Sequence, residues 1–275
     1  MPEGIDFEQQ IAQDRAIKEH MDAIGKKILV MSGKGGVGKT TVTINLANAL
    51  VDSGRTVGIL DTDLHGPNVA KMLGCEGASL VSNDEGKTFE PVQVRPGLKV
   101  MSLAFATQED QPIVWRGPMK MSAIRQFLEQ ANWGPLDYLL IDSPPGTGDE
   151  QLTVCQSIRS MTGSIIVTTP QDVAILDARR SVNFSKQLKL PVLGVVENMS
   201  GLICPHCGEE IDLFGKGGGK KLAEETGVPF LGSIPIELPV REDEDKGTSV
   251  LKDKPQSAST KAFLAIAAQI DGSKA

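Results

Sequence analysis

Residues 27–41 read Lys-Ile-Leu-Val-Met-Ser-Gly-Lys-Gly-Gly-Val-Gly-Lys-Thr-Thr, and this stretch decides the fold class. Its first part is an apolar run that ends at Ser32, which predicts a short buried strand. Its second part, from Gly33 to Thr40, has the spacing Gly-x-x-x-x-Gly-Lys-Thr of a P-loop. Apolar residues then recur at helical spacing: Val42, Leu46, Ala49 and Leu50. The order strand, glycine loop and helix therefore predicts a nucleotide-binding domain.

The glycine loop has the composition that phosphate binding requires. Glycines let consecutive backbone N–H groups turn towards an anion, because a Cβ atom would obstruct the approach. The N-terminus of the following helix adds unpaired N–H groups and a partial positive charge. We expect Lys39 to reach the β- and γ-phosphates and the Thr40 hydroxyl to ligate Mg²⁺. The other expected nucleotide contacts belong to the same loop: Gly33, Lys34, Gly35, Gly36, Val37, Gly38 and Thr41.

Carboxylates occur at two further positions where an open α/β sheet binds ligands, beyond the carboxyl ends of its strands. Asp61 and Asp63 follow a predicted buried strand at 56–60, and they are expected to face the Mg²⁺ and the γ-phosphate. The alternative for this pair is a solvated acidic turn. Asp142 closes a short apolar strand at 138–141, which is the Walker B arrangement of an outer-sphere Mg²⁺ partner.

Two loops near these acids are candidates for sensing or reading the nucleotide. Residues 143–149 read Ser-Pro-Pro-Gly-Thr-Gly-Asp, which predicts a switch loop. The two prolines stiffen it, and Gly146 is expected to leave a backbone N–H free for a γ-phosphate; an ordinary Pro/Gly turn is the alternative. Asn198 follows a strand predicted at 192–196, and its amide could read the adenine edge or only form a turn.

Length and composition limit the class of protein. A chain of 275 residues with 40% apolar residues fits one large α/β domain. We expect a helical extension at 1–25 and a single domain at 26–275, which includes a cysteine loop at about 199–215. The formal charge of −7 argues against a nucleic-acid partner. No long apolar run and no signal-peptide layout occur, so we expect a cytoplasmic protein without a membrane partner.

The remaining periodicities complete a doubly wound α/β pattern. Further strands are predicted at 98–103, 164–168 and 230–234. Helices are predicted at 7–24, 65–73, 117–130, 171–187, 220–226 and 257–270. Three segments have other expected roles, namely an exposed excursion at 76–96, a hinge or tight turn at 217–219, and a border of the nucleotide base at 235–244. We expect a mostly parallel sheet flanked by helices.

Residues 204–207 read Cys-Pro-His-Cys, and three interpretations compete for them. A redox pair needs a stabilised thiolate, whereas Glu209 and Glu210 are expected to raise the thiol pKa. A structural zinc site needs four ligands, and the chain has no second closely spaced cysteine pair. In the third interpretation, two chains related by a two-fold axis supply four thiolates to a [4Fe–4S] cluster or to Zn²⁺. The other two cysteines are isolated and are interpreted as buried apolar residues: Cys75 and Cys155.

The loop from Lys34 to Thr41 resembles the deviant P-loop of the MinD/ParA and nitrogenase iron-protein class. The resemblance implies that Lys34 reaches across a homodimer to the nucleotide of the partner. It also implies that Asp61 supports the Mg²⁺ waters and that Asp63 orients the attacking water. The catalytic set that follows is Lys34, Lys39 and Asp63.

From about Lys26 to Leu251 the chain resembles the Mrp/ApbC-type iron–sulfur cluster carriers. The segments that carry the resemblance are 33–41, 61–63, 66–67, 114–119, 144–149, 198–200 and 204–207. Ser143 stands where an apolar residue is common in the family. The four-cysteine N-terminal site of eukaryotic relatives and the small N-terminal domain of some bacterial ones are missing, so a second, permanent cluster is not expected.

The resemblance implies an ATPase that uses ATP and Mg²⁺ to carry a labile [4Fe–4S] cluster. Cys204 and Cys207 of two chains would hold the cluster at a homodimer interface. A cluster-assembly donor would load it, and apo iron–sulfur proteins would receive it. The alternative is a ParA/MinD-like positioning ATPase with a structural zinc at the cysteine pair, which predicts a basic patch or a basic terminal helix that the sequence lacks. A metabolic kinase is a weaker option, because no acceptor site can be named.

Overall fold

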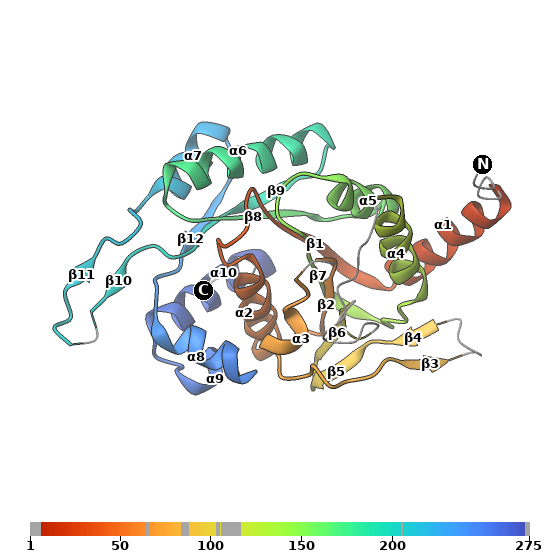
Figure 1. Ribbon diagram of the computed structural model, residues 1–275, viewed down its shortest axis with the longest axis horizontal. Helices are drawn as coiled ribbons and strands as arrows, with labels where there is room; N and C mark the ends of the chain where they lie inside the picture. Colours follow the sequence, from red (N-terminus) through yellow and green to blue (C-terminus); the bar gives the residue numbers. More distant parts are fainter. Residues whose placement is uncertain are drawn as a thin grey trace.

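The computed structural model describes residues 7–63, 66–83, 88–102, 105, 117–204 and 206–272. Within these residues a central sheet lies between two layers of helices (Figure 1). The strands of this sheet are β1 (Ile24–Ser32), β2 (Val57–Asp61), β5 (Val92–Arg95), β6 (Leu98–Ser102), β7 (Leu136–Asp142), β8 (Gly163–Thr168), β9 (Val192–Glu197) and β12 (Phe230–Ser233). They are arranged in the order β12-β9-β8-β1-β7-β2-β6-β5, and only β5 runs antiparallel to its neighbour. The predicted doubly wound, mostly parallel sheet is confirmed.

Helices cover both faces of the sheet. One face is covered by α2 (Lys39–Asp52), α3 (Val69–Met72), α9 (Val250–Asp253) and α10 (Ala258–Asp271), with α8 (Leu238–Lys246) packed beside α3. The other face is covered by α1 (Phe7–Asp22), α4 (Gly117–Gln130), α5 (Asp149–Ser157), α6 (Asp172–Gln187) and α7 (Gly218–Thr226). Two separate apolar cores result, one on each side of the sheet.

Strand β1 is apolar from Ile28 to Met31 because this part of the strand contributes to both cores. Ile28 and Val30 pack with the α2 side, whereas Leu29 and Met31 pack with the α6 side. Strands buried on both faces have continuous apolar runs rather than alternating ones. β1 lies between β7 and β8, where the strand order reverses, and such a switch point is where open α/β sheets bind ligands.

The predicted excursion at 76–96 is more ordered than expected. It contains β3 (Val81–Asn83) and β4 (Thr88–Glu90), which pair antiparallel, and it ends in the edge strand β5 of the main sheet. Each of these strands has only three or four residues. Strands this short offer too few residues for an alternating pattern to identify them, which explains why the excursion was predicted without strands.

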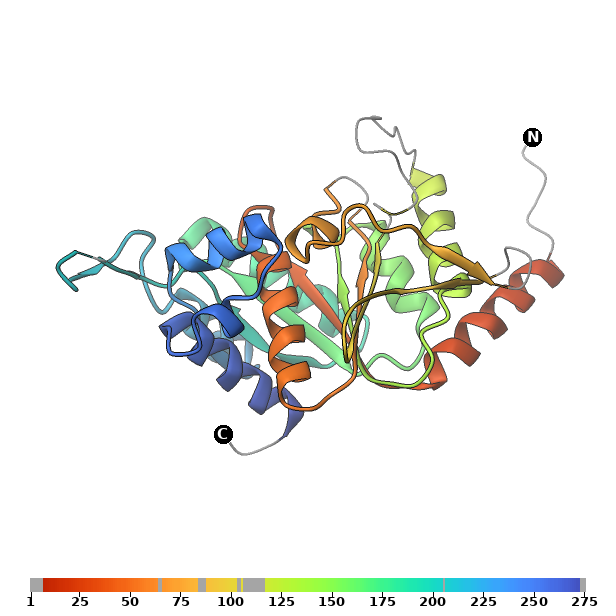
Figure 2. The same cartoon turned by 90° about the horizontal axis from the view of Figure 1, so that it is seen from below.

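The N-terminal helix α1 packs on the domain. Ile17 and Met21 are buried in the second core. Arg125 of α4 donates to Asp14 at 2.7 Å and to Gln13 at 2.8 Å. The helix ends at Asp22, two residues before β1 begins at Ile24. β1 therefore begins three residues earlier than the strand predicted from Lys27. In both views α1 lies at the end of the molecule opposite the small hairpin β10–β11 (Figures 1 and 2).

The hairpin consists of β10 (Leu202–Ile203) and β11 (Glu210–Ile211), and it carries the cysteine pair. Two stretches that carry the family resemblance, 114–119 and 204–207, lie partly outside the described residues, at 114–116 and at Pro205. No helix of the described ranges is long and apolar enough to cross a membrane.

Candidate functional site

The P-loop connects β1 to α2, and its glycines are required for different reasons. Gly36 and Gly38 adopt φ values of 79° and 78°, which L side chains rarely adopt. Gly38 is also the N-cap of α2, and a Cβ there would lie 2.2 Å from the Asn198 Nδ2. Gly33 has no positive φ, but a Cβ on it would lie 2.1 Å from the carbonyl carbon of Asp177 in α6. Gly33 is therefore needed for close packing against α6 rather than for phosphate approach.

The start of α2 fits an anionic ligand. No side chain caps this helix, so no carboxylate or hydroxyl of the loop occupies its N-terminus. A Cβ on Gly36 would meet no atom within 4 Å, so the space beside this residue is open. Uncapped helix N-termini that follow a glycine loop bind phosphate. The predicted loop residues thus form a cradle of the kind that nucleotide phosphates need.

Lys39, Thr40 and Thr43 surround one buried carboxylate, that of Asp142 at the end of β7. The Lys39 Nζ lies 2.7 Å from the Asp142 Oδ1, and both side chains are almost fully buried. The Thr40 hydroxyl donates to the Asp142 Oδ2 at 2.8 Å, and the Thr43 hydroxyl donates to the Oδ1 at 2.8 Å. The structure therefore joins the P-loop lysine and threonine to the predicted Walker B acid.

Asp61 lies beside Asp142, because β2 and β7 pair in parallel with these two residues in register. The two are only 2% and 1% exposed. Burial, and then the charge of Asp142, raise the pKa of Asp61 to about 8. Ser102 donates to the Asp61 carboxylate at 3.0 Å. Two buried carboxylates beside a threonine hydroxyl are hard oxygen donors, and together they fit a divalent cation such as Mg²⁺.

The other predicted catalytic residues lie around this centre. The backbone N–H of Asp63 donates to the Asp61 Oδ1 at 3.0 Å, which holds Asp63 directly beyond the strand end. The Lys34 carbonyl accepts from the Ser32 hydroxyl at 3.0 Å, and no ion pair between described residues involves the Lys34 ammonium. Roles for Lys34 and Asp63 in hydrolysis stay predictions.

One expectation about the switch loop is wrong for this conformation. The Gly146 N–H is not free, because it donates to the Ser32 carbonyl at 2.8 Å. Gly146 has a φ of 96° and open space where a Cβ would lie, so the glycine is required by conformation. A γ-phosphate could engage this N–H only after the bond to Ser32 is broken.

Thr41 contacts a residue that the sequence analysis did not single out for the site. Its hydroxyl donates to the Glu244 Oε2 at 2.9 Å, and the Asn45 amide donates to the Oε1 at 3.1 Å. Burial raises the pKa of Glu244 to about 7. Glu244 lies in the segment expected to border the nucleotide base, but that segment forms helix α8, and no local pattern indicated the contact with α2.

Asn198 lies directly after β9 and touches the P-loop. Its Nδ2 donates to the Val37 carbonyl at 3.0 Å, and its backbone N–H donates to the Thr168 carbonyl at 2.8 Å. The amide thus holds the backbone of the loop. Reading of the adenine edge by Asn198 stays a prediction.

The cysteine pair is presented at the end of the hairpin. The Cys204 N–H donates to the Glu209 carbonyl at 2.8 Å, and the Gly208 N–H donates to the Cys204 carbonyl at 2.9 Å. Cys204 is half-buried and Cys207 is exposed. Hydrogen bonds from the Cys207 N–H, the His206 N–H and the Cys207 side chain lower the pKa of Cys204. The expectation that the thiol pKa is raised is wrong, because these local donors lower the pKa of Cys204.

The remaining cysteines have a different environment. Cys75 and Cys155 are half-buried against the two apolar cores. Burial raises the pKa of each thiol to about 11. In the described part of the chain, no group of three or more His, Cys, Asp or Glu side chains could hold a metal ion. Each chain therefore offers the pair Cys204 and Cys207, and no larger set is assembled around it.

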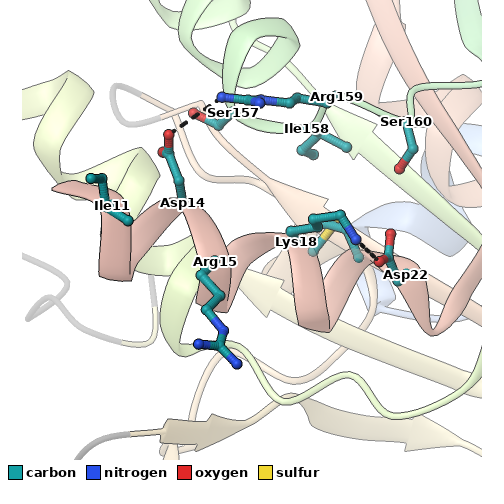
Figure 3. A pocket seen from close by; sticks show the side chains of 10 residues that line it. Ile11, Asp14, Arg15, Lys18, Asp22, Ser157, Ile158, Arg159 and Ser160 are labelled. Atoms are coloured by element: carbon teal, nitrogen blue, oxygen red, sulfur yellow. Dashed lines mark hydrogen bonds and ion pairs between the residues drawn. The ribbon is translucent and has the colours of Figure 1, made fainter.

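A cavity of about 460 Å³ lies away from both sites (Figure 3). It is bounded by α1 and by the connection from α5 to β8, and Ile158 lines it together with several charged side chains. These elements precede β1 and β8, so the cavity lies at the amino ends of the strands. The P-loop lies at the opposite, carboxyl ends, so this cavity is not part of the nucleotide site.

Fold and site together define the class of this protein, a P-loop nucleotide-binding protein of the ParA type. A model of the NUBPL iron-transfer P-loop NTPases matches residues 23–271. The chain belongs to this family.

Individual relatives agree with this family. The iron-sulfur cluster carrier protein of Methanocaldococcus jannaschii is 52% identical over 236 residues, which cover 86% of this chain and 81% of the relative. The nucleotide-binding protein of Archaeoglobus fulgidus, solved in complex with ADP, superimposes with a TM-score of 0.77 at 40% identity, covering 91% of this chain and 96% of the other. The cell division ATPase MinD of Pyrococcus furiosus superimposes with a TM-score of 0.65 at 27% identity, covering 90% and 99%.

Proposed function

We propose that this chain is an ATP-dependent carrier that holds a labile [4Fe–4S] cluster between two copies of itself. It would receive the cluster from an assembly donor and pass it to apo iron–sulfur proteins in the cytoplasm. The observation that carries the proposal is the hairpin of a P-loop ATPase that presents two accessible thiols, one with a lowered pKa. Thiolates are the ligands that iron–sulfur clusters require, so a lowered pKa favours cluster binding.

The proposal of a dimer follows from the number of ligands. A [4Fe–4S] cluster takes about four thiolates, and the cysteine pair of one chain supplies two. A two-fold axis through the cluster would bring the second pair. Exposed apolar side chains lie on the same hairpin and the segment after it, namely Ile203, Ile211 and Leu213. A partner hairpin would cover them, which gives the interface a hydrophobic contribution.

For the nucleotide site, we assign roles by position. Mg-ATP would supply the phosphoanhydride bond whose hydrolysis changes the state of the dimer. Lys39 would leave Asp142 and pair with the phosphates, while the Thr40 hydroxyl would turn towards the cation. Asp61 and Asp142 would hold water molecules of that cation. Asp63 would orient the attacking water, and Lys34 would reach the site of the other copy.

The alternative of a positioning ATPase with a structural zinc is not favoured. Curated relatives at about 50% identity over most of the chain have names of cluster carriers. A structural zinc would also need four ligands, whereas the cysteine pair of one chain supplies only two.

The proposal is tested by anaerobic reconstitution with iron and sulfide, followed by metal and sulfide analysis. We expect about four irons per dimer for the wild type. Cys204→Ser and Cys207→Ser should each lose stable cluster binding, because only two thiolates per dimer remain. The matched controls are Cys75→Ser and Cys155→Ser, which remove thiols of raised pKa outside the hairpin and should keep the cluster. One zinc per dimer without iron uptake would contradict the proposal.

A further inference from the structure

Glu197, the last residue of β9, is a fully buried carboxylate at the base of the cysteine hairpin. Its Oε1 accepts from the Ser200 hydroxyl at 2.6 Å and from the Gly217 N–H at 3.0 Å. Its Oε2 accepts from the Gly219 N–H at 2.6 Å. Ser200 precedes the hairpin and Gly217 follows it. One side chain therefore holds both ends of the segment that carries the cysteines.

Close packing explains two of the glycines after the hairpin, Gly219 against Glu197 and Gly218 against Pro170. A Cβ on Gly219 would lie 2.9 Å from the Glu197 Cβ, and a Cβ on Gly218 would lie 2.4 Å from the Pro170 carbonyl oxygen. Gly217 is the N-cap of α7, with a φ of 80°. The carboxylate thus occupies the N-terminus of α7, where a negative charge is stabilised. The segment at 217–219 is a helix start seated on Glu197.

The neighbouring residue links the same strand end to the P-loop. Asn198 donates to the Val37 carbonyl, as described above. That carbonyl shares one rigid peptide group with the Gly38 N–H, and in a trans peptide the two bonds point in opposite directions. A phosphate that accepts from the Gly38 N–H would therefore polarise or reorient the group that Asn198 holds. Glu197 is the next residue, so a shift at Asn198 reaches the hairpin base directly.

The return limb of the hairpin, which leads from β11 to α7, has free space beside it. A cavity of about 440 Å³ adjoins it, lined by Phe214, Lys216 and Gly217 on the hairpin side and by Pro170 and Gln171 at the start of α6. The two limbs are also joined by the antiparallel pairing of Leu202 with Ile211 and of Ile203 with Glu210. The hairpin can thus move as one body when its base moves.

We propose that Glu197 is a positioning residue that transmits the state of the P-loop to the cysteine hairpin through Asn198. The inference rests on the proposed function, because the movement of the hairpin would control cluster binding. The contacts that carry the inference do not depend on a bound cluster. If one limb moved alone, the buried carboxylate of Glu197 would lose a hydrogen-bond donor, which costs free energy. Both limbs are therefore expected to move together.

The test is hydrogen–deuterium exchange of the full-length protein, with and without Mg-ATP. In the wild type we expect nucleotide to change the exchange of the P-loop peptides and of the hairpin peptides at 200–217. In Glu197→Gln the amide must direct an N–H group at one of the backbone N–H donors, which breaks one attachment. Hairpin exchange should then rise about 5-fold, and its response to nucleotide should be lost, while the P-loop peptides keep their response.

The matched control is Asp137→Asn. Asp137 also accepts a backbone N–H and a hydroxyl, both from Thr56 at 2.8 Å, but it lies at the opposite end of β7 from Asp142. This variant should keep the response of the hairpin. If Glu197→Gln does not fold, Ser200→Ala removes one donor of the same cluster and should weaken the response. An unchanged response in Glu197→Gln, or no hairpin response in the wild type, would overturn the inference. Failure of iron uptake with an intact hairpin response would instead contradict only the proposed function.

Discussion

Replacement of Glu244 by Gln should stabilise the protein at alkaline pH and leave its stability unchanged at acidic pH. Glu244 is largely buried between α8 and α2, and burial raises its pKa from 4.5 to about 7. The glutamine side chain can keep both contacts, since its oxygen accepts from Asn45 and its N–H donates to the Thr41 hydroxyl. The substitution therefore removes a charge and little else.

The sign and the size follow from proton linkage. The folded state binds a proton at Glu244 more tightly than the unfolded state does. The loss of folding stability caused by ionising the buried Glu244 is therefore absent below about pH 4.5. It grows as the pH rises and is complete above about pH 7. The full shift corresponds to at most about 3 kcal/mol. Since the side chain keeps partial contact with solvent, we expect about 1–2 kcal/mol at pH 8.

The assay is urea unfolding of the nucleotide-free wild type and variant from pH 5 to pH 8.5. The difference in the free energy of unfolding should increase with pH across this range. Glu242→Gln is the control, because Glu242 is an exposed glutamate on the same helix and should give no such trend. A stabilisation by Glu244→Gln that is equal at all pH values, or a destabilisation at pH 8, would refute the reasoning.

Three further predictions concern the nucleotide site. Gly33→Ala should destabilise the fold by about 3 kcal/mol in urea unfolding, because its Cβ would overlap the α6 backbone. Gly77→Ala is the control and should have little effect in the same assay, because there is open space around Gly77. Lys39→Ala should weaken nucleotide binding measured by calorimetry, whereas Asp63→Ala should bind nucleotide and lose turnover; wild-type hydrolysis by Asp63→Ala would remove that residue from catalysis. Lys34→Ala should lose hydrolysis, and mixing it with Lys39→Ala chains should restore partial activity, because both defects fall in one composite site of the heterodimer. Heterodimers that form without any restoration would argue against a lysine that crosses the interface.

The fold class was predictable because its signals are local. The P-loop and the apolar run before it indicated strand, loop and helix, and acids at strand ends indicated the edge of the sheet where they meet. The register of β2 and β7 does bring Asp61 beside Asp142. Helix 117–130 was predicted with the bounds that α4 has.

The elements that were missed are short or strongly polar. Helix α8 has the sequence Leu-Pro-Val-Arg-Glu-Asp-Glu-Asp-Lys, which lacks an apolar stripe of helical period. The hairpin strands β10 and β11 have two residues each. Such elements are held by tertiary contacts, such as the Thr41 hydrogen bond to Glu244, rather than by their own propensity.

The site contacts that were missed join residues far apart in the chain. Glu244 meets α2, and Glu197 meets the start of α7, without any spacing in the sequence that relates them. The pKa of Cys204 was predicted in the wrong direction because only neighbouring charges were considered. Backbone N–H donors supplied by the turn itself lower that pKa.

The most direct test of the central claim is the transfer of a cluster from this protein to an apo-ferredoxin. Wild-type protein reconstituted under anaerobic conditions is mixed with apo-ferredoxin and a chelator of free iron, and the holo-ferredoxin spectrum is followed by circular dichroism. We predict transfer that the chelator does not suppress, at a rate that changes with Mg-ATP, and no transfer from Cys204→Ser or Cys207→Ser protein. A reconstituted wild type that yields holo-ferredoxin only without the chelator would contradict the claim, because the iron would then travel through solution.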